Sequence, residues 1–226
     1  MLMANETLLA PSAIDYNTLS SAMSQAWLSS VDDVQLFLQR SQSESWSLED
    51  SIVKNSHFGA QCGFGLSVYS GEKTGFAYAD HIDAPALMNA AKAARSIAQA
   101  GQSKQLSLTT PSSPKALYSP NNPLKRTDDQ DKVALLQRIN TYARTLDSRV
   151  QQVMIHLSAE HDTVLIMNTS GQLTADIRPL VNIMVTVTVE AKGRRERGSA
   201  GGGGRTDYAF FTEADQGLSY AREAVR

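Results

Sequence analysis

The chain has only one cysteine, no long apolar run and no strong excess of charge of one sign. Cys62 has no second cysteine to pair with, so a disulfide within the chain is excluded. The longest apolar segment, residues 181–189, is interrupted by Asn and Thr and is far shorter than the roughly 20 residues that span a bilayer. With 21 basic and 23 acidic residues, the net charge is −2, which is unlike the basic balance of most nucleic-acid binders. We therefore predict no membrane and no nucleic-acid partner.

The beginning of the chain also lacks the basic region and continuous apolar stretch of a secretory signal. We therefore expect a cytoplasmic protein, in keeping with the single cysteine. What the chain does have is 226 residues with 42% hydrophobic content, enough to build a sizeable core. This composition excludes disorder as a description of the whole chain.

Short alternating segments between turn residues predict strands in hairpin order. Residues 64–69 and 74–78 flank Ser70-Gly-Glu-Lys73, a connection typical of a hairpin. Residues 181–189 show the clearest alternation of apolar and polar side chains. Further strands are predicted at 34–40, 45–48, 52–54, 150–158, 163–167 and 194–197, and turns at 49–50, 160–162, 168–171 and 191–193.

Helices are predicted between these strands and at both ends of the chain. Asp83 is expected to cap a helix that has Pro85 in its first turn and ends at Gly101. Thr127 is expected to cap a helix that runs to Leu146. Residues 15–28 and 218–226 also have helical patterns, and 102–126, with four prolines, predict an irregular connection. The fold class that follows is α+β, a mostly antiparallel sheet packed against a few helices.

The candidates for metal or nucleophilic chemistry are weak. His156 and His161 are five residues apart, a spacing that matches no metal-binding motif. Cys62 has no cysteine partner for a zinc site and no base that the sequence places beside it. We expect no catalytic residue and no metal ligand in this chain.

The most unusual segment is Gly-rich and basic. Residues 192–205 contain five basic residues and one acidic residue, and 198–205 read Gly-Ser-Ala-Gly-Gly-Gly-Gly-Arg. This order departs from the G-x-x-x-x-G-K-[ST] phosphate loop. The open alternatives are a flexible linker, a backbone that another chain approaches closely, or a strand edge that binds an extended peptide through main-chain hydrogen bonds.

Four segments carry a resemblance to a known family. They are residues 44–54, 70–80, 175–180 and 195–205. In their order along the chain they resemble the amino-terminal half of the TldD/PmbA family of metallopeptidases. The TldD branch is the more similar one, chiefly through Ser-Gly-Glu-Lys-Thr-Gly-Phe-Ala-Tyr and the Gly-rich stretch.

This resemblance implies that residues 1–226 are one amino-terminal domain, truncated before a catalytic carboxy-terminal domain. It implies a zinc peptidase, formed with a PmbA/TldE-like partner subunit, that degrades unfolded peptides or trims them during peptide maturation. The family's H-E-x-x-x-H motif is absent here. The chain is therefore expected to hold no zinc and to be inactive alone. Candidates for lining a peptide path are Arg195, Arg197, Gly201, Gly202, Gly203, Gly204 and Arg205.

Two alternative functions remain open at this point. The chain can be a stand-alone peptide-binding or assembly adaptor without protease activity. It can also be a nucleotide-binding enzyme that uses the Gly-rich segment.

Overall fold

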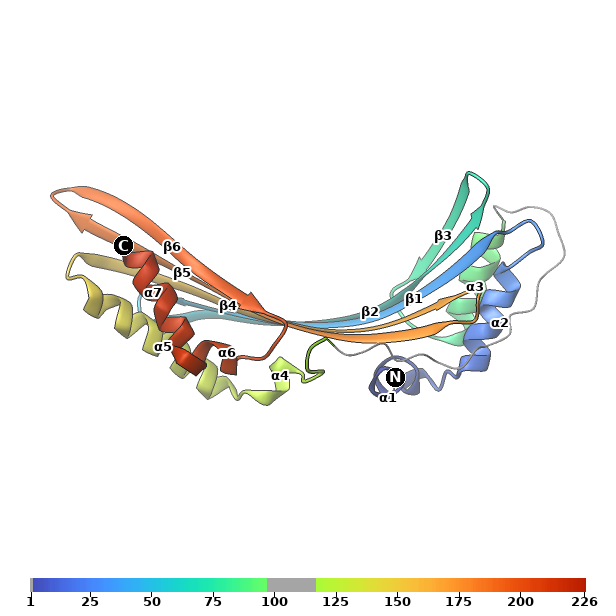
Figure 1. The fold of residues 1–226 in the computed structure, drawn as a ribbon, viewed down its shortest axis with the longest axis horizontal. Helices are drawn as coiled ribbons and strands as arrows, with labels where there is room; N and C mark the ends of the chain where they lie inside the picture. The colour runs from blue at the N-terminus through green and yellow to red at the C-terminus, as the bar shows by residue number, and fades with distance from the viewer. Residues whose placement is uncertain (1, 97–116) are drawn as a thin grey trace. The chain divides into compact units, whose positions relative to one another are not determined.

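The computed structural model describes residues 2–96 and 117–226 and contains one six-stranded sheet (Figure 1). The strand order is β3-β2-β1-β4-β5-β6. The outer pairs, β2 with β3 and β5 with β6, are antiparallel. The predicted α+β class with a mostly antiparallel sheet is confirmed. The strands are β1 (Asp33–Glu49), β2 (Ile52–Ser70), β3 (Lys73–Ala79), β4 (Val150–Asn168), β5 (Leu173–Ala191) and β6 (Arg194–Gly204).

Every strand except β3 is much longer than the sequence pattern predicts. The turn expected at 160–162 is wrong, because β4 runs straight through it. Ala159, His161 and Thr163 are all buried, so the alternation of the strand continues across the polar residues. Likewise, β1 joins the two short strands predicted at 34–40 and 45–48.

The chain divides into two units, and strands β1, β2, β4 and β5 contribute to both. Unit 1 has the described residues 2–41, 60–96 and 162–177. Unit 2 has residues 42–59, 117–161 and 178–226. Each unit has its own hydrophobic core.

Unit 1 packs helices α2 (Tyr16–Ala26) and α3 (Ala84–Arg95) together over its core. It also contains α1 (Leu2–Leu8) and the short helix η1 (Ala10–Ser12). The predicted cap is confirmed, because the Asp83 carboxylate accepts a 2.7 Å hydrogen bond from the Ala86 amide. The predicted helix end at Gly101 lies outside the described residues.

Unit 2 packs helices α5 (Asp129–Leu146) and α7 (Gln216–Val225) against each other, with α7 also on β6 (Figure 1). Buried Leu135, Leu136 and Ile139 of α5 join the core that β4 and β5 supply. The predicted cap Thr127 is wrong, because α5 begins at Asp129 and the capping position is Asp128, whose side chain makes no capping hydrogen bond. The other helices of this unit are α4 (Pro123–Arg126), α6 (Ala209–Thr212) and η2 (Glu213–Asp215).

Helix α4 lies within the region predicted to be an irregular connection. Asn122 caps it, with its side-chain oxygen 2.9 Å from the Leu124 amide. The residues 97–116 of that predicted connection lie outside the described residues. Within the described part of the chain, no helix is long and apolar enough to cross a membrane.

Candidate functional site

The Gly-rich basic segment forms β6, one of the two outer strands of the sheet. Lys192 and Gly193 both have positive φ and close a two-residue turn that pairs Ala191 with Arg194. From there the register runs without a break to Val181 opposite Gly204. The flexible-linker and phosphate-loop interpretations are therefore wrong, because the alternating strand β5 provides a pairing partner for every one of these glycines.

Helix α7 approaches the backbone of β6 closely at two glycines. A Cβ at Gly198 would overlap the carbonyl oxygen of Ala224, and one at Gly202 would lie 2.5 Å from the Tyr220 hydroxyl. At Gly201 and Gly203, a Cβ would overlap carbonyl oxygens of β5. The glycines thus allow this chain to pack on itself: the backbone is closely approached, but by a helix of the same chain and not by another chain as expected.

The arginines of this segment differ in how far their charges are already paired. The Arg195 Nε lies 2.7 Å from Glu190 Oε2. The Arg205 guanidinium lies 5.7 Å from the centre of the Tyr118 ring. Within the described residues, no carboxylate pairs with the exposed Arg197. Arg197 therefore offers the least compensated charge of the three candidates on or beside β6.

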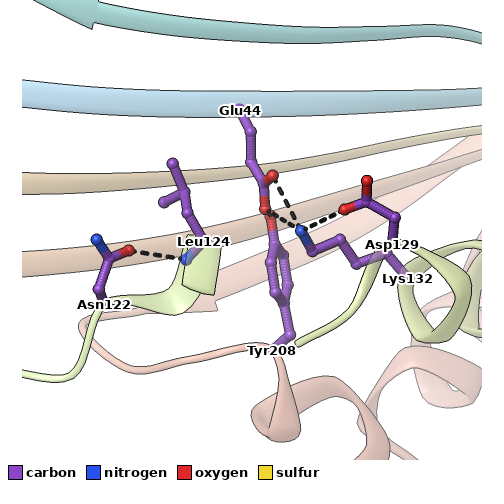
Figure 2. A network of polar contacts seen from close by, with 6 residues as sticks. All are labelled: Glu44, Asn122, Leu124, Asp129, Lys132 and Tyr208. Carbon is purple, nitrogen blue, oxygen red and sulfur yellow. Dashed lines mark hydrogen bonds and ion pairs between the residues drawn. The ribbon is translucent and has the colours of Figure 1, made fainter. Parts of the chain in front are cut away.

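A buried polar network, which the sequence analysis did not identify, links β1 to α5 and to the segment before α6 (Figure 2). Lys132 Nζ lies 2.9 Å and 3.0 Å from the two carboxylate oxygens of Glu44, and 3.1 Å from Asp129 Oδ1. The Tyr208 hydroxyl donates to Glu44 at 2.8 Å. The exposed fractions are 1% for Lys132, 8% for Glu44 and 2% for Tyr208.

The polar groups of this network are already paired with one another and are not arranged for a chemical reaction. Lys132 Nζ donates hydrogen bonds to Glu44 Oε2 and Asp129 Oδ1 and forms an ion pair with Glu44 Oε1, so both carboxylates are paired with this cation. Burial, followed by the hydrogen bond and charge of Glu44, raises the pKa of Tyr208 far above its ordinary value, so the phenol stays protonated. The ring centres of Trp46 and Tyr208 lie 5.6 Å and 5.7 Å from Lys132 Nζ and stabilise the same cation. The arrangement anchors three segments of unit 2 to one another.

The sequence does carry a signal for Lys132. Position 132 belongs to the apolar stripe of α5, three and seven residues before the buried Leu135 and Ile139. A lysine on such a stripe indicates a buried ion pair, but its partner is 88 residues away in the chain.

The described residues do not fit a metal centre. No group of three His, Cys, Asp or Glu side chains within 2–96 and 117–226 is placed to hold an ion. His161 is buried in β4, with Nε2 3.4 Å from the Pro120 carbonyl oxygen. Burial raises the pKa of the Cys62 thiol, against a weaker opposing effect of Arg40, which disfavours the nucleophilic thiolate.

Known protein families match both parts of the chain. Residues 34–98 match domain 1 of the PmbA/TldA metallopeptidases, and residues 122–226 match their central domain. The "Metalloprotease TldD homolog" of Haemophilus influenzae is 42% identical over 98% of this chain and 47% of its own length. The homologue of the same name from Buchnera aphidicola of Schizaphis graminum is 36% identical over 99% of this chain and 48% of its own length.

Among solved structures, TldE from Thermococcus kodakarensis has a TM-score of 0.68 at 16% identity. The match covers 92% of this chain and 46% of that one, and at this identity it shows the fold alone. The chain belongs to the TldD/PmbA metallopeptidase family, as the resemblance predicts. It spans about half the length of the curated relatives that it matches.

Proposed function

We propose that this chain is the amino-terminal, non-catalytic part of a TldD-type zinc metallopeptidase. In this proposal, the full protein acts in the cytoplasm with a PmbA/TldE-like partner subunit and degrades unfolded peptides or trims them during maturation. Two relatives over 35% identical along nearly the whole chain carry the metalloprotease name, which supports the proposal. The residues described here lack a group that fits the metal, so the hydrolytic step belongs to another part of the protein.

The contribution of this chain is to bind the peptide in an extended form along β6. The observation that carries this proposal is that a Gly-rich, basic strand lies at the outer position of the sheet. An outer strand presents main-chain donors and acceptors on its free side, which bind a peptide with little dependence on its sequence. Arg197 and Arg205 add positive charge that attracts acidic peptides.

Removing these charges tests the proposal. We expect the R197A/R205A variant to bind a fluorescein-labelled, unstructured acidic peptide about 2- to 30-fold more weakly in fluorescence anisotropy, since each of the two exposed ion contacts contributes about 0.2–1 kcal/mol. Arg149→Ala is the matched control, because Arg149 is an exposed arginine of the same unit beside Asp147. Equal affinities of R197A/R205A and the unchanged chain would remove β6 from the peptide path.

The second candidate function is a stand-alone peptide-binding or assembly adaptor without protease activity. The same lack of a metal-binding group among the described residues favours it. Both functions share the peptide-binding edge. They differ in whether the chain increases peptide cleavage when it is joined to a metal-binding domain of the family.

A further inference from the structure

The outer strand of unit 1, β3, carries two aromatic side chains on the side away from the core. Ala77 and Ala79 pack against the hydrophobic core of unit 1. Phe76 and Tyr78, which alternate with these alanines, are 61% and 76% exposed. Their ring centres lie 6.0 Å apart with 24° between the ring planes, so the two rings form one exposed aromatic surface. The faces of such rings attract a cationic group.

A glycine of the neighbouring strand holds the aromatic pair close to the sheet. Gly65 of β2 lies opposite Tyr78 in the register. A Cβ at Gly65 would lie 2.9 Å from the Phe76 ring, so this ring lies against the backbone of β2. The packing limits the freedom of the Phe76 side chain, and a ligand therefore has less motion to restrict when it binds there.

A carboxylate follows the two aromatic residues. Asp80 is the next position in the alternating series of Phe76 and Tyr78 and comes directly after β3. Its side chain is 98% exposed, although its Oδ1 lies 2.9 Å from His81 Nδ1. The hydrogen bond with His81 lowers the pKa of Asp80, so the carboxylate is ionised at neutral pH. The end of β3 therefore combines aromatic faces with an accessible negative charge.

Asp80 also lines a cavity of about 720 Å³ within unit 1. Phe37 and Gln39 of β1 and Gln61 of β2 contribute to its lining. Of the described residues that line it, Asp80 alone carries a formal charge, because burial raises the pKa of the Cys62 thiol. A cavity of this size accommodates a long side chain, and its single carboxylate favours one with a positive charge.

Strand β3 has a free edge as well. It pairs with β2 on one side, and no strand in residues 2–96 or 117–226 pairs with its other side. Residues 73–79 therefore offer main-chain donors and acceptors to an added strand. An extended peptide on this edge lies next to both the aromatic pair and the carboxylate.

We propose that β3 binds an extended, basic peptide segment. The peptide pairs with the free edge of β3, and one of its Lys or Arg side chains lies on the exposed ring of Tyr78 and forms an ion pair with Asp80. The choice of a peptide as the ligand rests on the proposed function. The location and the preference for positive charge rest on the aromatic pair, the carboxylate and the free edge. The two outer strands thus differ, since the basic β6 attracts acidic peptides.

Peptides of opposite charge test this proposal separately from the one on β6. The basic probe is a rhodamine-labelled, unstructured decapeptide of Gly, Ser and Lys, and its matched peptide has Gln in place of Lys. We expect the unchanged chain to prefer the basic probe. The Y78A/D80N variant should bind that probe about 3- to 30-fold more weakly in fluorescence anisotropy and should keep its affinity for the acidic peptide.

The conditions and the control isolate the charge of Asp80. The measurements are made at pH 8.5, because the hydrogen bond with Asp80 raises the pKa of His81 and a protonated His81 would compensate the carboxylate. Glu6→Gln is the matched control, since it removes an exposed carboxylate from the same unit, and it should leave the affinity unchanged. Circular dichroism shows whether each variant is folded. If Y78A/D80N does not fold, D80N alone decides, with an expected loss of about 1.5- to 5-fold.

The outcomes separate the two proposals. Equal affinities of Y78A/D80N and the unchanged chain for the basic probe would overturn the β3 site and leave the β6 site in place. Weaker binding by Y78A/D80N together with full affinity for the basic probe in R197A/R205A would support the β3 site. If light scattering finds the unchanged chain dimeric and Y78A/D80N monomeric, and neither binds the basic probe, a second copy occupies this surface and the proposal is overturned.

Discussion

At the residue scale, Lys132 places a buried positive charge inside unit 2. Its ammonium is 1% exposed and is held by Glu44 and Asp129. In the Lys132→Met variant, Glu44 would keep a buried carboxylate with only the Tyr208 hydroxyl as a donor. We expect a loss of about 3–5 kcal/mol in the free energy of unfolding, measured by urea denaturation at neutral pH.

The neighbouring Lys125→Met is the control for Lys132→Met, because Lys125 is exposed. It should change the free energy of unfolding by about 0.5 kcal/mol or less. Adding Glu44→Leu to Lys132→Met removes the unpaired carboxylate and should restore part of the lost stability. Equal stability of K132M and the unchanged chain would show that the network contributes nothing to the fold.

The sequence predicts contacts between residues that are close in the chain better than contacts between residues that are far apart in it. The Asp83 cap was predictable, because donor and acceptor are three residues apart and the capping rule needs only nearby residues. The pair of Lys132 and Glu44 was not, because 88 residues separate the partners.

At the scale of elements, β6 and α7 depend on glycines at particular positions. We expect Gly198→Ala to cost about 1–3 kcal/mol in urea denaturation, because its Cβ meets rigid backbone at Ala224. Gly202→Ala should cost less, because the Tyr220 hydroxyl that it meets is at the end of a side chain. Gly204→Ala is the control, since its Cβ meets nothing nearer than 3.7 Å.

The order of the three variants distinguishes this explanation from a general effect of glycine in a strand. If flexibility alone mattered, all three alanines would stabilise β6 to a similar, small extent. The Tyr220→Phe change should in addition restore stability to G202A, because it removes the atom that lies 2.5 Å from the added Cβ. Equal effects at 198 and 204 would contradict close packing of α7 on β6.

The strands also show where sequence patterns mislead at this scale. Polar residues at 160–162 have the composition of a turn, but β4 continues because it lies between β1 and β5 in the sheet, and His161 is buried. The Gly-rich segment similarly lacks strand propensity and becomes a strand through pairing with β5. The helices were more predictable, since their caps and apolar stripes are local.

At the scale of the whole molecule, the two units correspond only approximately to the two family regions. The family regions are continuous, at 34–98 and 122–226, whereas each unit is assembled from three separate stretches of chain. Long shared strands cause this difference, because β1, β2, β4 and β5 each contribute residues to both units. The description of residues 1–226 as a single domain stays a prediction.

The proposed function assigns hydrolysis to another part of the full protein, and this assignment can be tested on this chain alone. Since the described residues hold no group fit for a metal, we expect far less than one zinc per chain after dialysis against zinc, measured by mass spectrometry of the metal content. We also expect no cleavage of an unstructured peptide that the chain binds in anisotropy. A full-length family member, carried through the same dialysis, is the positive control. One zinc per chain with measurable turnover would show that residues of this chain form a metal centre, and would overturn the assignment of hydrolysis to another part of the protein.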